Sequence, residues 1–343
     1  MTPATQAKEL PDEIPPDVRN EIHRYVKTLP DDASCIVTGS IVEGIGNINS
    51  DIDLYIIQQA GSFTPKPIAI GIRESRYMDL EFLSDQTVRR LAEKFADPAA
   101  DVLQDLNDRD FDRYYRIAIG IPLVAEDWVH DILPEFTVDR SRALFSRKAM
   151  VRAYHHLARG AVAHAMGQTR GAQVLLREAA LWRATSVLAD AGEGYPSIKW
   201  AEVKAARHFG AGTAQYTACL SGYLDSSPDT TTHLSQARER IPLTDDVRQA
   251  FPDQPWELAE NVQVITDGDA QYLVRGAQSV ARVSGVVALV ISELAAGAPW
   301  TDATANIATK LQVSRGELGA AASAVLRELG RGGYLHRSAG EVA

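Results

Sequence analysis

The chain has 343 residues, of which 45% are hydrophobic and 23% charged, and its formal net charge is −10. This composition is typical of a folded globular protein of two or three domains and excludes long intrinsic disorder. The acidic balance argues against a protein that mainly coats DNA or an anionic membrane. Only two cysteines, Cys35 and Cys219, are present. A disulfide framework is therefore excluded, and we expect a cytoplasmic protein with no membrane partner.

The first part of the chain predicts one helix followed by short strands. Apolar residues recur at helical spacing in PPDVRNEIHRYVKTL, and the two prolines mark its start. Four segments are typical of strands because they are apolar or alternate polar with apolar residues: SCIVTGS, DIDLYII, PIAIGIR and RYMDLEFL. From Asp85 to about Leu224 the pattern is helical. Strands followed by helices predict an α+β protein with a mixed sheet and an α-helical bundle.

The last third of the chain begins with a change of composition. Residues 225–257 are rich in proline, threonine and acids, which is typical of a linker. After it, NVQVITDGDAQYLVRG predicts a hairpin with its turn at Asp267–Gly268, and three helical segments follow. We therefore expect a small winged-helix-like domain at 258–343, preceded by a mixed-sheet domain at 1–139 and a helical bundle at 140–250.

One segment, TGSIVEGIGNINSDIDL at 38–54, combines groups that carry chemistry. A strand leads into Gly39 and Ser40, where a glycine lets a phosphate approach the backbone N–H groups. Asp51 and Asp53 are separated by one residue, so alternation in a strand places both carboxylates on one face, about 7 Å apart along the backbone. Two such carboxylates repel each other unless a cation lies between them, and Mg²⁺ is the expected cation.

A third acid on a neighbouring strand would complete a two-metal site of the kind used in nucleotidyl transfer. The segment RYMDLEFL offers two acids on one face, Asp79 and Glu81. Each of these two acids lies between two apolar residues, so both fit the expected pattern of an acid flanked by apolar residues. Asp79 is the first choice and Glu81 the alternative.

The run GSIVEGIGNINSDIDL resembles the signature of the DNA polymerase β-like nucleotidyltransferase superfamily, a Gly-Ser followed by an Asp-x-Asp on a strand. The resemblance implies that Asp51 and Asp53 hold Mg²⁺, with Asp79 as third ligand. It also implies that Gly39 and Ser40 bind the triphosphate, and we expect the polar Ser50, directly before the first aspartate, to belong to the same nucleotide-binding site.

Two further resemblances concern the rest of the chain. The segment at 180–224 is similar to the helical domain of aminoglycoside adenylyltransferases, and this implies that Lys199 contacts the nucleotide phosphates. An ordinary surface lysine beside the N-cap Ser197 is the alternative. Glu178 could act as a general base, with a solvated helical glutamate as its alternative. The region 258–337 resembles the winged-helix fold of peptide-recognition domains in ribosomal peptide pathways.

The expected activity is Mg²⁺-dependent transfer of a nucleoside monophosphate, AMP from ATP, to a hydroxyl group of a small acceptor such as an aminoglycoside-like compound, with release of pyrophosphate. Two alternatives stay open. The acceptor could be a peptide or protein presented by the C-terminal domain. The chain could also be a non-catalytic DNA-binding regulator that retains the fold, although a nucleic-acid partner is not favoured by the charge.

Overall fold

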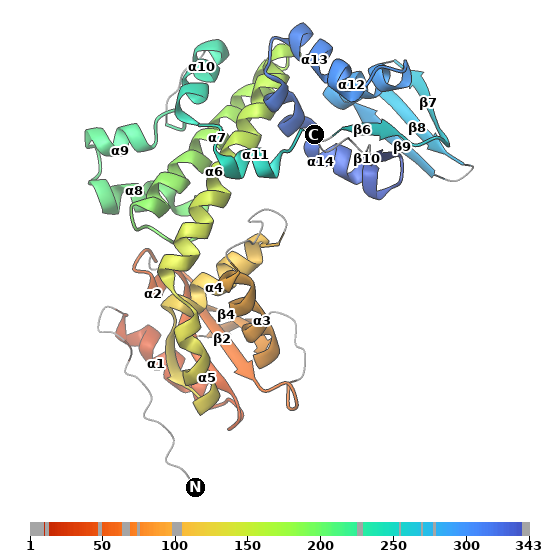
Figure 1. The fold of residues 1–343 in the computed structure, drawn as a ribbon. Helices are drawn as coiled ribbons and strands as arrows, with labels where there is room; N and C mark the ends of the chain where they lie inside the picture. Colours follow the sequence, from red (N-terminus) through yellow and green to blue (C-terminus); the bar gives the residue numbers. More distant parts are fainter. Residues whose placement is uncertain are drawn as a thin grey trace. The chain divides into compact units, whose positions relative to one another are not determined.

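The computed structural model describes residues 10, 14–46, 50–63, 69–73, 76–97, 105–224, 229–253, 255–268, 270–276 and 279–337. The chain divides into two compact units, which are taken separately below (Figure 1). Unit 1 combines Met1–Lys148 with Thr185–Tyr216, and unit 2 combines Ala149–Ala184 with Thr217–Ala343. The division falls within two long helices, α6 (Val138–Ala165) and α7 (Thr169–Asp190). The predicted α+β class is confirmed, with a mixed sheet and a helical bundle. The three predicted domain boundaries stay a prediction.

Unit 1 contains a five-stranded mixed sheet in the order β3-β4-β2-β1-β5. Its strands are β1 (Ser34–Thr38), β2 (Ile52–Gln58), β3 (Ala69–Arg73), β4 (Arg76–Ser84) and β5 (Ile121–Val124). β2 and β4 run parallel, and the other neighbours are antiparallel. The first four strands were predicted. The fifth was not, because its four residues lie within a stretch that otherwise has helical periodicity.

The two faces of the sheet carry different residues, and β2 shows the pattern clearly. Ile52, Leu54 and Ile56 belong to a buried apolar cluster that includes Val18 and Ile22. These last two lie on helix α1 (Pro16–Val26), so α1 covers that face. Because side chains alternate along a strand, the residues between them in β2 point to the opposite face.

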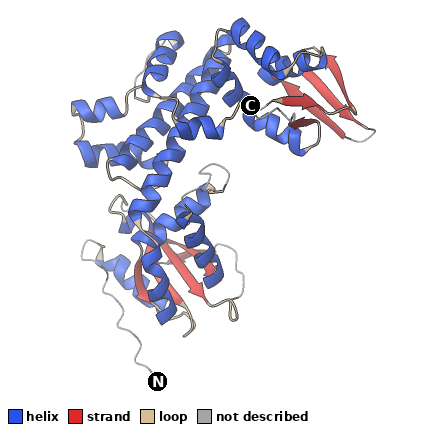
Figure 2. Cartoon of the chain, in the orientation of Figure 1, coloured by secondary structure: helices blue, strands red, loops and turns tan. Residues whose placement is uncertain are grey.

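Helix α4 (Asp108–Ile119) contacts that opposite face, where the Thr38 hydroxyl donates to the carbonyl of Arg116 at 2.5 Å. A capping box formed by Asn107 and Asp110 fixes the start of α4. The rings of Phe95 and Tyr114 stack 3.9 Å apart and join α4 to α3. Helices therefore flank the sheet of unit 1 (Figure 2). The other helices that lie in this unit are α2 (Gly39–Val42), α3 (Asp85–Ala96), α5 (Asp127–Ile132) and α8 (Ala201–Phe209), with 3-10 turns η1 (Leu133–Glu135) and η2 (Ile198–Trp200).

Unit 2 combines helices with two small sheets. Its strands are β6 (Trp256–Leu258), β7 (Val262–Asp267), β8 (Ala270–Arg275), β9 (Ser279–Ser284) and β10 (Leu335–Arg337). β7, β8 and β9 form an antiparallel meander, and β6 pairs with β10. The predicted hairpin is the β7–β8 pair. The helices are α10 (Thr230–Arg240), α11 (Asp245–Ala250), α12 (Gly285–Ala295), α13 (Trp300–Leu311) and α14 (Arg315–Arg331), while α9 (Ala214–Cys219) spans the division between units.

The stretch interpreted as a linker at 225–257 holds two helices, which corrects that expectation. Asp229 accepts hydrogen bonds from two backbone N–H groups at the start of α10, and Thr244 accepts one at the start of α11. The same polar residues that suggested a loop are helix caps here. The winged-helix assignment stays a prediction. Among the described residues, none of the helices is both long enough and apolar enough to cross a membrane.

Candidate active site

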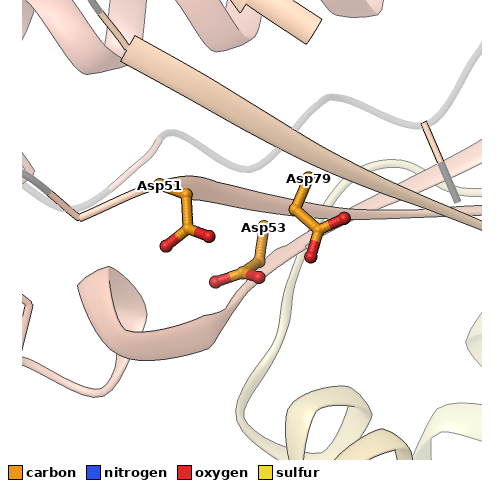
Figure 3. Close-up of side chains that lie close together, drawn as sticks. All are labelled: Asp51, Asp53 and Asp79. Carbon is orange, nitrogen blue, oxygen red and sulfur yellow. The ribbon is translucent and has the colours of Figure 1, made fainter. Parts of the chain in front are cut away.

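Three carboxylates meet on the α4-facing side of the sheet in unit 1. Asp51 lies directly before β2, Asp53 lies in β2, and Asp79 is the residue opposite Asp53 on the parallel strand β4. Each of them offers an oxygen atom, and these oxygens all lie within 4.8 Å of one another. Figure 3 shows the three side chains on the same side of the strands, with Asp53 between the other two. Strand alternation and a parallel register together produce this cluster.

Burial makes the charge of this cluster costly. Asp53 is 5% exposed, and the pKa of its carboxyl is raised from an ordinary 3.8 to about 6. Burial is the main cause, the charges of Asp51 and Asp79 act in the same direction, and Arg116 opposes the rise. Burial also raises the pKa of Asp79. The Oδ1 atom of Asp79 is buried and accepts no hydrogen bond from any described residue. Such an oxygen is stabilised by a bound cation.

Arg116 on α4 compensates part of the negative charge. Its Nη1 donates to Asp53 Oδ1 at 2.6 Å, and its Nε donates to Asp112 Oδ1 at 3.0 Å. Asp112 lies one helical turn earlier in α4, so the two carboxylates hold the guanidinium from different sides. They keep the pKa of Arg116 above its ordinary value even though burial lowers it. One arginine faces three clustered aspartates and Asp112, which leaves the site net negative.

The turn at Gly39 lies directly against Asp53. Gly39 has φ +83°, and a Cβ at this position would stand 1.8 Å from Asp53 Oδ2. Only glycine therefore allows the backbone and the carboxylate to approach this closely. The turn is closed by hydrogen bonds from the N–H groups of Glu43 to the Gly39 carbonyl at 3.0 Å and of Gly46 to the Ser40 carbonyl at 2.7 Å. Ser40 is buried.

Of the two candidate third acids, only Asp79 lies in the cluster. Glu81 shares the face of Asp79 on β4, but its Oε1 accepts hydrogen bonds from Arg109 at 2.7 Å and from the Nε of Arg113 at 2.9 Å. Burial alone would raise the pKa of Glu81, and the hydrogen bonds from these arginines lower it below its ordinary value. Glu81 is thus a salt-bridged carboxylate beside the site.

The other two predicted phosphate-binding residues have different surroundings. Ser50 is half-buried and directly precedes Asp51, while residues 47–49 of the motif lie outside the described residues. Lys199 is exposed in the 3-10 turn η2, and its ammonium lies 4.8 Å from the centroid of the Trp200 ring. Its backbone N–H donates to Ser197 Oγ. This is the cap that the alternative interpretation expected.

A hydrogen-bond network that was not foreseen from the sequence joins the turn to α8. Arg207 donates to both carboxylate oxygens of Glu193, to the Glu43 carbonyl at 2.9 Å and to Glu43 Oε1 at 2.9 Å. Tyr115 donates its hydroxyl to Glu43 Oε2 at 2.8 Å. Glu43 is the C-cap of α2, so this network holds the end of the Gly39–Ser40 turn.

In unit 2, Glu178 and several arginines near the C-terminal end have close partners. His156 Nδ1 lies 2.8 Å from Glu178 Oε2, which gives Glu178 a partner on the neighbouring helix. Arg315 pairs with Asp253 at 2.6 Å and Arg331 pairs with Glu328, while Arg337 lies over the Trp256 ring. The carboxylates of Asp253 and Glu328 offset part of the positive charge near the C-terminal end of the chain.

Comparisons with known proteins find similarity among solved structures but not among family models or curated proteins. No family model matches the chain, and no curated protein matches it. Among solved structures, a nucleotidyltransferase-like protein from Exiguobacterium sibiricum 255-15 is similar over 78% of this chain and 98% of its own, with 12% identity and a TM-score of 0.38. Because both the identity and the TM-score are low, the function is inferred below from the carboxylates and the turn beside them.

Proposed function

We propose that the protein is a Mg²⁺-dependent nucleotidyltransferase that transfers a nucleoside monophosphate, AMP from ATP, to a hydroxyl group of a small acceptor and releases pyrophosphate. The observation that carries the proposal is the meeting of three carboxylates, with oxygens within 4.8 Å of one another, beside a turn whose glycine touches one of them. A carboxylate cluster with Asp53 buried at its centre is explained by a function that needs divalent cations next to a polyphosphate.

The donor set fits Mg²⁺. Asp51, Asp53 and Asp79 offer hard carboxylate oxygens, and the buried Oδ1 of Asp79 lacks a hydrogen-bond donor among the described residues. Asp53 still presents Oδ2 when Arg116 occupies Oδ1. When bound, the metal would polarise the α-phosphoryl group and offset the charge that develops on the leaving pyrophosphate.

The chain's own residues would divide the remaining tasks. The backbone of Gly39 and Ser40, where no Cβ stands in the way, would bind the β and γ phosphates. The acceptor hydroxyl oxygen bonds to the α-phosphorus, the bond from that phosphorus to the bridging oxygen breaks, and pyrophosphate leaves. Asp79, whose pKa is raised by burial, would accept the hydroxyl proton. Arg116 would keep Asp53 in place by holding its Oδ1.

The test is incubation of the protein with labelled nucleoside triphosphates, Mg²⁺ and a panel of hydroxylated acceptors, with mass detection of adducts. Asp51→Asn should abolish transfer and leave the fold intact. Glu81→Gln is the matched control, because Glu81 is also an acid of this face but pairs with arginines. Transfer by Asp51→Asn at the wild-type rate would contradict the proposal. Comparing ATP with other triphosphates in the same assay identifies the donor.

A peptide is the second candidate acceptor, and one feature of unit 2 favours it. Trp256 and Trp300 line a pocket of about 470 Å³ together with Pro255, Leu258 and Leu294. Aromatic and proline walls of this size suit an apolar peptide side chain. If the acceptor is a peptide, Trp256→Ala should reduce transfer to peptides and leave transfer to small acceptors unchanged. Equal transfer to peptides by wild type and variant would exclude this pocket as the docking site.

A further inference from the structure

Several arginines in this protein pair with carboxylates. Arg116 pairs with Asp53 at 2.6 Å, and Arg207 and Arg238 each pair with a glutamate. Two arginines of unit 2 differ, Arg183 on α7 and Arg240 at the end of α10. Across the described ranges of the chain, both donate only to uncharged oxygens. In a chain with a net charge of −10, two neighbouring guanidinium groups that donate to uncharged oxygens form a local positive site.

Both arginines line the same pocket. Its walls also include Ser221, Gly222 and the side chain of His233, which is 5% exposed. The remaining lining is apolar and small: Ala180, Ala237 and Ile241. The interior volume is about 10 Å³, which is room for about one water-sized oxygen atom. One oxygen of a larger group could enter, while the rest of that group stays at the mouth.

Within the described residues, each guanidinium donates through one terminal nitrogen, Nη1. Arg183 Nη1 donates to the carbonyls of Ala218 and Cys219 at 3.3 and 3.4 Å. Arg240 Nη1 donates to Ser221 Oγ at 2.7 Å. A guanidinium has five N–H donors, and Nη2 and Nε of each arginine have no acceptor among the described residues, so their donors can serve a ligand. The arginines are therefore fixed by the turn after α9 and still have donors to offer.

The two positive charges destabilise each other in the absence of an anion. Burial lowers the pKa of Arg183, and the neighbouring charge of Arg240 lowers it further. An anion bound between them would remove this repulsion and accept charge-assisted hydrogen bonds. The charge of two arginines matches a dianion, and a guanidinium fork matches the oxygens of a phosphoryl group.

We propose that this pocket binds a phosphoryl group, with one of its oxygens inserted between Arg183 and Arg240. The site lies in unit 2 and uses none of the carboxylates of unit 1. The phosphoryl site is independent of the proposed nucleotidyl transfer, so refuting one proposal does not refute the other. Free phosphate, pyrophosphate and the phosphate of a nucleoside monophosphate share the required chemistry.

The test is calorimetric titration of the full-length protein with inorganic phosphate, without divalent metal. Arg183→Gln and Arg240→Gln should each weaken binding at least about 10-fold, the size expected for the loss of one charge-assisted contact. The matched control is Arg177→Gln, because Arg177 is an exposed arginine on the same helix that lines no part of the pocket. Absence of saturable phosphate binding, or equal binding by wild type and the two pocket variants, would overturn the proposal.

Chemical modification of the wild-type protein is a second test, and it stays valid even if the substitutions disturb folding. Phenylglyoxal modifies accessible arginines, and the modified positions are mapped by peptide mass. Phosphate should protect Arg183 and Arg240 at least several-fold and leave Arg177 equally modified. Titration with pyrophosphate and with a nucleoside monophosphate then identifies the preferred source of the group. If acetate binds and protects as well as phosphate, the site is a general anion site and the phosphoryl assignment is wrong.

Discussion

Replacing Gly39 by alanine separates backbone strain from damage to the carboxylate cluster, because a matched control lies in the same turn. Gly39 and Gly44 both have positive φ, +83° and +74°. A Cβ on Gly39 would stand 1.8 Å from Asp53 Oδ2, whereas a Cβ on Gly44 meets no atom within 4 Å. The two alanine variants therefore share the strain and differ in the collision.

The sizes of the two effects follow from these distances. A left-handed backbone costs a non-glycine residue about 1–2 kcal/mol, and this applies to both variants. Atoms in ordinary contact lie about 3.5 Å apart, so the oxygen of Asp53 in Gly39→Ala must retreat by roughly 1.5 Å or more. Mg²⁺ requires ligands close to its ideal distances, and a displacement of about 1 Å in an active site can cost 100-fold in rate.

The assay combines urea denaturation with metal-dependent nucleotidyl transfer. We expect Gly44→Ala to lose about 1–2 kcal/mol of unfolding free energy and to keep its activity within a few-fold. Gly39→Ala should lose at least this stability and at least about 100-fold in transfer rate. If Gly39→Ala transfers nucleotide as fast as Gly44→Ala, the contact between the turn and Asp53 has no part in the activity.

Three further predictions concern charge. In the metal-free protein, Asp53 has a pKa of about 6 when folded and an ordinary 3.8 when unfolded. The folded state therefore binds the proton more tightly than the unfolded state. The protonated Asp53 stabilises the fold below pH 4, and this stabilisation is lost as the pH rises through 6. The unfolding free energy lost over this pH range is about 2–3 kcal/mol. Urea denaturation of Asp53→Asn should lack this pH-dependent loss. Identical pH profiles for wild type and variant would refute Asp53 as the cause. Arg207→Ala leaves the half-buried Glu43 and the buried Glu193 without their shared partner. Unfolding free energy should therefore fall by about 2 kcal/mol, and the KM for the triphosphate should rise more than kcat falls. Unchanged values of both quantities would exclude a positioning role. Glu81→Gln should lower thermal stability, because Arg109 and Arg113 lose their carboxylate partner. Nucleotidyl transfer should stay near the wild-type rate. Loss of transfer without loss of stability would instead make Glu81 a participant in the reaction.

Local patterns in the sequence were sufficient to predict the strands that carry the carboxylates. Alternation in DIDLYII and RYMDLEFL places Asp53 and Asp79 on one face of each strand, as the register of β2 and β4 shows. Whether Asp79 or Glu81 joins the cluster depends on α4, which brings Arg109 and Arg113 to Glu81. Helix periodicity predicts that α4 exists but not which strand residues its arginines reach.

Contacts between distant segments could not be predicted from one sequence. Arg116 and Asp53 are 63 positions apart, and Arg207 and Glu43 are 164 positions apart. No spacing rule links such residues, because their proximity depends on how helices pack on the sheet. The short strand β5 was missed for a related reason, since it is defined by pairing with β1 more than by its own four residues.

A calorimetric titration tests most directly whether the three aspartates form a metal site. The protein is titrated with Mn²⁺ in the presence of a non-hydrolysable triphosphate, and the heat of binding is measured. We expect saturable binding in the wild type and in Glu81→Gln, and its loss in Asp51→Asn and Asp79→Asn. Undiminished binding in both aspartate variants, or no saturable binding in the wild type, would contradict a metal site at these carboxylates.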